Sequence, residues 1–307
     1  MSDLRSSQGL RHPVTSIFLT LFIVLVVFQL IGPLIGMLIA YPFYPGSPDE
    51  FQKSLEDPFK HPELRSIILI MQGCGAFFGL IVVPYFLLRA QGRDLRNLLS
   101  GQVYPRIILI SILVVLISVP LNSFFIEWNK GITLPWGDDW FRGMEKKLEE
   151  GTKFLIQFNS PLDTLGVLIV IAILPAIGEE IVFRGMIQKD LYRATGNIHV
   201  AIWVAAILFS AIHIQFLGFV PRMLLGALFG YLYYWSGSLW MAILGHFVNN
   251  GFALGAMYLQ QRGVVDADLE NTSLPWQAVL VSALCTALLL YSFKTFFNHN
   301  PKSDIPD

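Results

Sequence analysis

The stretch VLIVIAILPAIGEEIVFRGMIQ, residues 167–188, decides the fold of this chain. It is long and apolar enough for a membrane-spanning helix, which requires about 20 residues, yet it holds two adjacent glutamates, Glu179 and Glu180, followed by Arg184. A carboxylate at bilayer depth costs roughly 2.5–3.5 kcal/mol on insertion scales, so an ionisable residue there marks a functional site by default. The stretch therefore predicts a membrane helix that carries chemistry.

The composition of the whole chain also indicates a membrane protein. Hydrophobic residues make up 54% of its 307 residues and charged residues only 14%, with a mean hydropathy of +0.58. A soluble domain normally carries about 25% charged residues. The sequence shows no basic patch suited to nucleic acid. We therefore expect an all-α, polytopic integral membrane bundle that contacts the lipid bilayer and has no nucleic-acid partner.

Apolar stretches of span length predict about eight transmembrane helices. They cover residues 15–40, 66–88, 107–127, 163–183 with a helical continuation to about 194, 198–216, 218–235, 238–259 and 276–296. The two short helices between 198 and 235 are joined through Gly218 and Pro221 and could form one re-entrant unit, which would leave seven spans. Residues 1–307 then form one membrane domain, with N-terminal helices at 14–127, an extramembrane loop at 128–162 and a helical core at 163–296 that holds the polar motifs.

The basic residues predict how the chain lies in the membrane. The first apolar run exceeds the h-region of a signal peptide, about 7 to 15 residues, so we expect it to stay as a membrane helix. The short loop between 89 and 106 holds four arginines, whereas the loops 41–65 and 260–275 are acidic. Because short cytoplasmic loops are enriched in Lys and Arg, we expect a multi-pass protein of the cell membrane with both termini in the cytoplasm.

Three further features are interpreted more simply. The proline-rich loop 41–65 predicts an irregular cap. The segment GMEKKLEEGTKFLIQF, residues 143–158, fits either an amphipathic helix lying in the membrane interface or an ordinary solvated connector with some helix. The two cysteines, Cys74 and Cys285, fall inside predicted spans, where we expect buried free thiols.

Three short motifs collect nearly all the polar side chains of the second half of the chain. They are EEIVFR at 179–184, FSAIH at 209–213 and HFVNN at 246–250. Residues four apart lie on one face of a helix, so each motif presents one polar face. Glu179 lies about 15 residues before the turn near 196 and His213 about 15 after it, each some 22 Å along its helix. Three helices can therefore bring an acid, two imidazoles and an amide to one buried pocket.

The two glutamates are expected to differ in role. They point about 100° apart around the helix, and Glu180 has Arg184 at the favourable acid-before-base spacing, which predicts a buried ion pair. Glu179 is then free to face the histidines as a general base. Pro175 and Gly178 are expected to bend the helix and open a water-filled cleft.

Simpler interpretations of these polar residues also stand. His213 or His246 alone could be a helix–helix hydrogen-bonding residue, and Asn249 and Asn250 could serve the same purpose. Several other intramembrane chemistries lack their motifs, because the chain has no HExxH pair, no GxSxG elbow and no aspartate pair within the spans. Ser210 near His213 is conceivable as a nucleophile but has no further support. A glutamate acting with histidines is what remains.

In that order, the three motifs fit the EExxxR, FxxxH and HxxxN signatures, and the chain resembles the CAAX prenyl protease and bacteriocin-processing (CPBP, or Abi) intramembrane protease family. The resemblance covers about 80 residues, from 175 to 255. It implies an integral membrane endopeptidase of eight helices that forms no covalent acyl-enzyme. It gives Glu180 and Arg184 the supporting role of holding the helix and tuning the base.

The resemblance also implies roles for the other motif residues. Glu179 and His213 would activate the attacking water, while His246 and Asn250 would stabilise the oxyanion of the tetrahedral intermediate. This preferred mechanism requires no cofactor. As an alternative, Glu179, His213 and His246 could ligate Zn²⁺ with an open position for water.

The substrate and even the activity have more than one candidate. A prenylated C-terminal peptide, a leader peptide or a membrane-anchored protein would each suit an intramembrane endopeptidase. A proton-coupled transporter could use the same buried Glu/His cluster as a relay, although the sequence shows no inverted half-repeats. A non-catalytic membrane partner or immunity factor could retain the pocket without activity.

Overall fold

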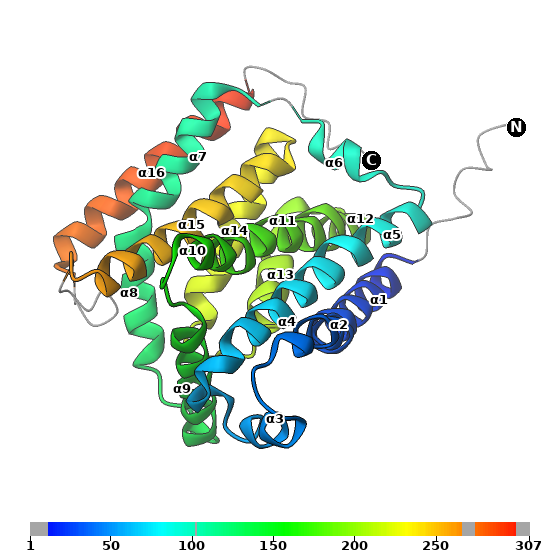
Figure 1. The fold of residues 1–307 in the computed structure, drawn as a ribbon. Coiled ribbons are helices and arrows are strands. Elements are labelled where there is room, and N and C mark those ends of the chain that lie inside the picture. Colours follow the sequence, from blue (N-terminus) through cyan, green and yellow to red (C-terminus); the bar gives the residue numbers. More distant parts are fainter. Residues whose placement is uncertain (1–11, 102, 266–273, 299–307) are drawn as a thin grey trace, which may run out of the picture.

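The computed structural model describes residues 12–101, 103–265 and 274–298, and every element in them is helical (Figure 1). The first half holds α1 (Pro13–Val26), α2 (Gly32–Ala40), α3 (Pro48–Ser54), α4 (Arg65–Phe77), α5 (Val83–Ala90), α6 (Leu95–Leu99), α7 (Pro105–Ile117) and α8 (Val119–Lys130). The second half holds α9 (Asp138–Leu155), α10 (Pro161–Val167), α11 (Leu174–Glu180), α12 (Gln188–Thr195), α13 (Ile198–Ala211), α14 (Phe219–Ser236), α15 (Leu239–Gln261) and α16 (Trp276–Asn298).

Five continuous helical runs within the described residues are long and apolar enough to cross a membrane. They are Pro13–Phe43, Pro62–Ala90, Pro105–Lys130, Pro161–Thr195 and Trp276–Phe297, and Ile198–Ala211 is a shorter apolar helix. The expected all-α, polytopic bundle is therefore confirmed, and the chain is a multi-pass membrane protein. The remaining three expected spans, 198–216, 218–235 and 238–259, coincide with α13, α14 and α15, so a total of eight crossings stays a prediction.

Three of the long runs contain a π-helical segment that ends two residues before a proline. These segments are η1 (Val27–Ile31) before Pro33, η5 (Phe78–Val82) before Pro84, and η6 (Leu168–Ile173) before Pro175. A proline lacks the N–H that a helix needs and its ring clashes with the carbonyl four residues earlier, so widening the preceding turn relieves that clash. The helix around Pro175 thus continues through the irregularity.

Glycines allow neighbouring helices of the bundle to approach closely, first α2 and α4. A Cβ at Gly32 or Gly36 of α2 would lie 2.6 Å from a Cα of α4, at Gly75 or Met71 respectively. Small residues four apart allow this kind of backbone contact between membrane helices. Likewise a Cβ at Gly178 would lie 2.4 Å from the Cβ of Leu80 in η5, so the helix that carries the two glutamates is pressed against its neighbour.

The helices are arranged with the polar motifs in the middle of the bundle. α7, α8 and α16 form one side, α1, α2 and α4 form the other, and α11 to α15 lie between them (Figure 1). At one end, Arg65 of α4 bonds the Leu155 carbonyl and Asp163, the latter at 2.7 Å. At the other end, buried Asp190 of α12 pairs with Arg93 at 3.5 Å and accepts a hydrogen bond from Ser16 of α1.

Two connecting segments are more ordered than the sequence indicated. The loop 41–65 is not an irregular cap, because it contains α3, whose N-terminus is closed by a reciprocal capping box between Ser47 and Glu50. In the segment 128–162, residues Asp138–Leu155 form the helix α9, which both interpretations allow. Whether α9 lies in a membrane interface stays a prediction. Cys74 and Cys285 are free, as expected, but both are half-buried rather than buried.

Candidate active site

The fully buried Glu180 is the hub of the site. It ends α11, and the π-helical segment η7 (Ile181–Ile187) follows directly. Its Oε1 atom accepts a hydrogen bond from Arg184 Nη1 at 2.9 Å and lies 2.7 Å from Nδ1 of His246 on α15. The expected ion pair with Arg184 is therefore present, but Glu180 also holds one of the histidines, a contact between distant helices that the spacing of the motifs did not predict.

Arg184 is enclosed by groups that stabilise its charge. Its Nη2 atom donates to the carbonyl of Gly226 in α14 at 2.7 Å. Its guanidinium carbon lies 4.9 Å from the ring centre of Phe209 and 5.6 Å from that of Phe229, distances at which a cation is attracted to a ring face. Arg184 thus links α11, α13 and α14 around the pocket.

His246 is fixed in orientation by two contacts. Its ring stacks on Phe229 with 5.2 Å between centroids and 17° between planes. Because Glu180 Oε1 accepts a hydrogen bond, Nδ1 of His246 carries the proton, and in the neutral ring Nε2 keeps its lone pair. That Nε2 atom lies 4.0 Å from Oε2 of Glu179. The separation is too long for a direct hydrogen bond, and such a gap suits one bridging water.

Glu179 faces both histidines, and its side chain remains 14% exposed. Besides His246, its charge acts on His213 and on Arg222 of α14. His213 donates from Nδ1 to the carbonyl of Phe209 at 2.7 Å, so its Nε2 atom is also left as an acceptor. The ring of Phe209 lies between the two imidazoles, at 5.2 Å from His213 and 6.0 Å from His246.

His213 lies outside a helix, where the sequence had predicted one. α13 ends at Ala211 rather than near 216, and the chain turns through Ile214, the one non-glycine residue with a positive φ (+54°) among the described residues. Such a conformation is unusual for a β-branched residue. Consequently His213 lies in the turn at residues 212–218, which connects α13 to α14.

Asn250 is placed differently from the other expected residues. Its side chain accepts a hydrogen bond from Asn249 at 3.1 Å, and within the described residues it makes no hydrogen bond to Glu179 or to either histidine. Three of the four expected catalytic residues therefore converge, while Asn250 lies one helical turn beyond His246 on α15.

Two charged residues near the site were missed by the sequence analysis. Arg222 lies in the first turn of α14, and Glu145 of α9 accepts a short hydrogen bond from the backbone N–H of Leu217. The signal for Arg222 was an isolated cation in an apolar stretch. Glu145 gave no such signal, because charges abound in its amphipathic segment.

The three side chains proposed as alternative Zn²⁺ ligands do not form a ready metal site. Within the described residues no group of three or more His, Cys, Asp or Glu side chains is close enough to hold a metal ion. Oε2 of Glu179 and Nε2 of His246, which would both have to bind the ion, lie 4.0 Å apart. Ligation by this set would require their side chains to move.

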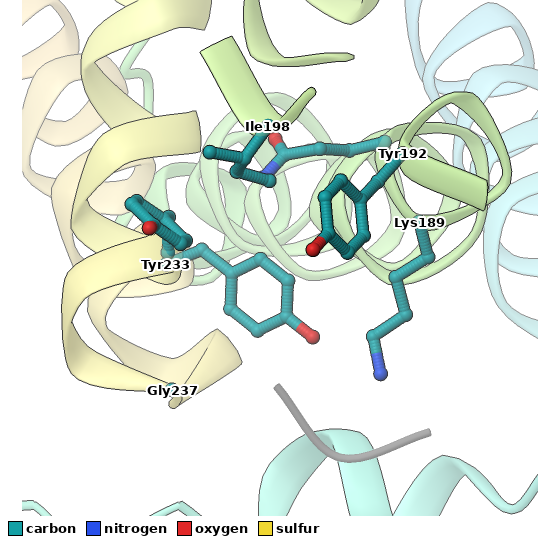
Figure 2. A pocket seen from close by; sticks show the side chains of 7 residues that line it. Lys189, Tyr192, Ile198, Tyr233 and Gly237 are labelled. Carbon is teal, nitrogen blue, oxygen red and sulfur yellow. The ribbon is translucent and has the colours of Figure 1, made fainter. Parts of the chain in front are cut away.

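Two cavities lie near the helices of the site, one beside the glutamates and one away from them. An apolar cavity of about 190 Å³ lies between η6–α11 and α15, starting one turn from the glutamates. Its lining comprises Ile173, Ala176, Ile177, Trp240, Ile243, Leu244 and Phe247. A small cavity of about 10 Å³, lined by residues that include Lys189, Tyr192 and Tyr233, lies at the α12 end (Figure 2). It is separate from the glutamates and histidines.

Comparison with known proteins bears on the same helices. Residues 161–252 match the family model of Type II CAAX prenyl endopeptidase Rce1-like proteins. The resemblance that the motifs predicted is thereby confirmed for this Rce1-like segment, which runs from α10 into α15 and contains all three motifs. The segment is under a third of the chain, so the three long apolar runs before α10 lie outside the match.

One curated relative and the solved structures add little beyond this. Uncharacterized protein YpbD of Bacillus subtilis (strain 168) is 29% identical over 85 residues, which are 26% of this chain and 40% of that protein. The match thus spans less than half the length of that relative. No solved structure matches the chain.

Proposed function

We propose that the chain is an intramembrane endopeptidase that hydrolyses a peptide bond of a membrane-associated substrate by a glutamate-activated water. The observation that carries the proposal is the gap of 4.0 Å between Glu179 Oε2 and His246 Nε2, with His246 held by Glu180. The Rce1-like segment, whose family model describes endopeptidases, supports the same reaction class.

The reaction would begin with a water held by Glu179 and His213. Glu179 takes a proton from the water, the oxygen attacks the peptide carbonyl carbon, and the carbonyl electron pair moves to the oxygen. Collapse of this tetrahedral intermediate breaks the C–N bond, and the leaving nitrogen receives the proton from Glu179. A general base of this kind contributes about 10²- to 10⁴-fold in rate.

His246 would stabilise the oxyanion by donating from Nε2. Because Nδ1 is already bonded to Glu180, donation from Nε2 requires a ring that carries a proton on both nitrogens. One oxyanion donor is worth about 10²- to 10³-fold in a dry site. Asn250 would join it only after its side chain leaves Asn249.

The apolar cavity supports a substrate that approaches from the lipid. It lies beside α11, one turn before the glutamates, and has space for an apolar side chain or part of a lipid chain. A prenylated C-terminal peptide, a leader peptide and a membrane-anchored protein would all present such groups. The proposal is therefore limited to membrane-associated peptides as a class.

The test compares membrane proteomes of a deletion strain complemented with wild type, Glu179→Gln or the matched control Glu150→Gln, an exposed residue of α9. We expect uncleaved precursors in the deletion and Glu179→Gln strains and normal products in the control. Precursor processing by Glu179→Gln at the wild-type rate would refute the proposal. Proton-coupled solute flux in liposomes, without proteolysis, would favour a transporter instead.

Metal dependence is tested on the purified enzyme. In the preferred mechanism activity survives exhaustive chelation, and bound zinc is substoichiometric. If activity is lost on chelation and restored by Zn²⁺, the alternative applies in which Glu179, His213 and His246 rearrange to hold the ion and lower the pKa of its bound water.

A further inference from the structure

Arg222 is a cation of the site with one buried nitrogen that makes no hydrogen bond within the described residues. It lies in the first turn of α14, and one of its nitrogens, Nη2, donates to the amide oxygen of Gln215. The other, Nη1, is buried and makes no hydrogen bond within the described residues. An unmade hydrogen bond of a buried charged group is costly, and a native structure rarely keeps one without a partner arriving from elsewhere.

The surroundings of Arg222 disfavour a cation that has only a structural role. The first turn of a helix carries a partial positive charge, so a carboxylate is stabilised there and a guanidinium is not. The charges of Glu179 and Glu145 act on Arg222, but neither forms an ion pair with it among the described residues. In contrast, Arg184 has a carboxylate, a carbonyl and two ring faces around it.

Arg222 is also close to the reacting groups. Its charge acts on His213, as does that of Glu179, and its partner Gln215 follows His213 in the same turn. Gln215 is a neutral partner, which an anion would readily replace or supplement. An anionic group that enters this turn would therefore meet an available N–H donor beside the proposed water-activating pair.

We propose that Arg222 binds a carboxylate of the peptide substrate and so fixes which bond lies against Glu179. This inference rests on the proposed function, because it names the recognition element of that same site. A guanidinium binds a carboxylate through two parallel hydrogen bonds, which specifies position as well as charge. The carboxylate is either the C-terminus of the substrate or an acidic side chain near the cleaved bond.

This role differs from stabilisation of the oxyanion. A substrate carboxylate keeps its charge throughout the reaction, so its loss weakens binding of substrate and transition state alike and raises KM. An oxyanion donor acts only in the transition state, so its loss lowers kcat. The two roles are therefore separable by kinetics.

Binding is measured first, on the Glu179→Gln protein in lipid nanodiscs, so that the result does not depend on cleavage. The probes are a prenylated peptide with a free C-terminal carboxylate, the same peptide as its C-terminal amide, and a third amidated peptide with one added internal glutamate. Each is compared in Glu179→Gln alone and with Arg222→Gln, Arg222→Lys or Arg106→Gln, the last being an exposed arginine at the start of α7.

The expected result is that the free acid binds about 10- to 100-fold tighter than the amide, as a charge-assisted bond implies, and that Arg222→Gln removes this preference. Arg222→Lys should retain part of it, and Arg106→Gln all of it. If the internal glutamate instead restores binding of the amide, Arg222 recognises an acidic side chain. Equal binding of all three probes, binding of none, or a preference that survives Arg222→Gln overturns the inference.

Cleavage by the protein with an intact Glu179 separates this inference from the proposed function. An Arg222→Gln enzyme with raised KM and unchanged kcat supports carboxylate binding, whereas lowered kcat with unchanged KM overturns it. Tight, carboxylate-dependent binding without any cleavage by the wild type would refute the proposed endopeptidase while leaving the role of Arg222 intact.

Discussion

Adjacent glutamates in this chain have opposite surroundings, and the difference lies in what the neighbouring helices offer. Glu180 is fully buried and shares one oxygen between Arg184 and His246. Glu179 keeps some exposure and makes no direct hydrogen bond in the described structure, although His246 lies 4.0 Å away. A buried carboxylate bonded to an arginine and a histidine is suited to holding geometry, even though Oε2 of Glu180 makes no hydrogen bond within the described residues, while a carboxylate with access to water is suited to taking a proton.

Substitutions of the two glutamates should therefore separate stability from activity. Glu180→Ala leaves Arg184 buried without its carboxylate, and removing one partner of a buried ion pair costs about 3–5 kcal/mol. We expect a large drop in thermal stability in detergent for Glu180→Ala and loss of cleavage at nearly unchanged stability for Glu179→Gln. Equal destabilisation by both substitutions would contradict the division of roles.

At the residue scale the motifs predicted which side chains meet but not how they bond. Spacing placed Glu179, His213 and His246 at one depth, and the structure brings them together. The bond from Glu180 to His246 and the position of Arg222 could not be predicted, because both depend on how α15 and α14 rotate against α11. Asn250 shows the same limit, because its side chain bonds the adjacent Asn249.

At the scale of elements, α9 and α8 both contact the turn 212–218. Glu145 accepts the backbone hydrogen bond of Leu217, and the rings of Phe141 and Phe216 lie 6.0 Å apart. On α8, Asn129 bonds the Phe216 carbonyl at 3.0 Å. The turn that carries His213 is therefore held by two elements from the middle of the chain.

Glu145 makes this contact dependent on pH. Burial is the main influence on this group and raises the pKa of the Glu145 carboxyl above its ordinary 4.5, against opposing effects of the Leu217 N–H and the nearby Arg222, Lys130 and Arg142. A raised pKa means that the folded protein favours the protonated acid, so stability is lost as pH rises from about 4.5 through the folded pKa.

Glu145→Gln should therefore be more thermally stable than wild type at pH 7.5, because glutamine keeps an oxygen for Leu217 without a charge to bury. The advantage should vanish below about pH 4.5, where wild-type Glu145 is protonated. The measurement is the difference in melting temperature in detergent at the two pH values, with exposed Glu150→Gln as a control that shows no shift. A variant less stable than wild type at pH 7.5 would contradict this sign.

Element boundaries were predicted well where hydropathy alone set them and poorly where polar contacts did. The long runs at 13–43, 62–90 and 105–130 match the expected spans within a few residues. α13 stops early because Ser210 bonds the Phe219 carbonyl at 2.7 Å and closes the turn. For α9 the sequence left open whether it lies in the membrane interface or in solvent, and its packing against Phe59 is a contact that the sequence does not reveal.

At the scale of the whole molecule, the position of the basic residues at one end of the bundle predicts how the chain is oriented in the membrane. The arginine-rich loop around α6 lies at one end of the bundle, and α3 and α9 lie at the other (Figure 1). The turn between α14 and α15 belongs to the α6 end, because a Cβ on Gly101 would lie 2.5 Å from that of Ser238. The turn that carries His213 belongs to the α9 end.

The positive-inside rule therefore predicts that α6 lies in the cytoplasm and that α9, with the turn that carries His213, lies on the opposite side. In a variant with Cys74 and Cys285 replaced by alanine, a cysteine at exposed Glu150 of α9 should react with a membrane-impermeant thiol reagent in intact cells. A cysteine at exposed Asn97 of α6 should react only after the cells are opened. The reverse pattern would invert the orientation and place the proposed cleavage on the cytoplasmic side.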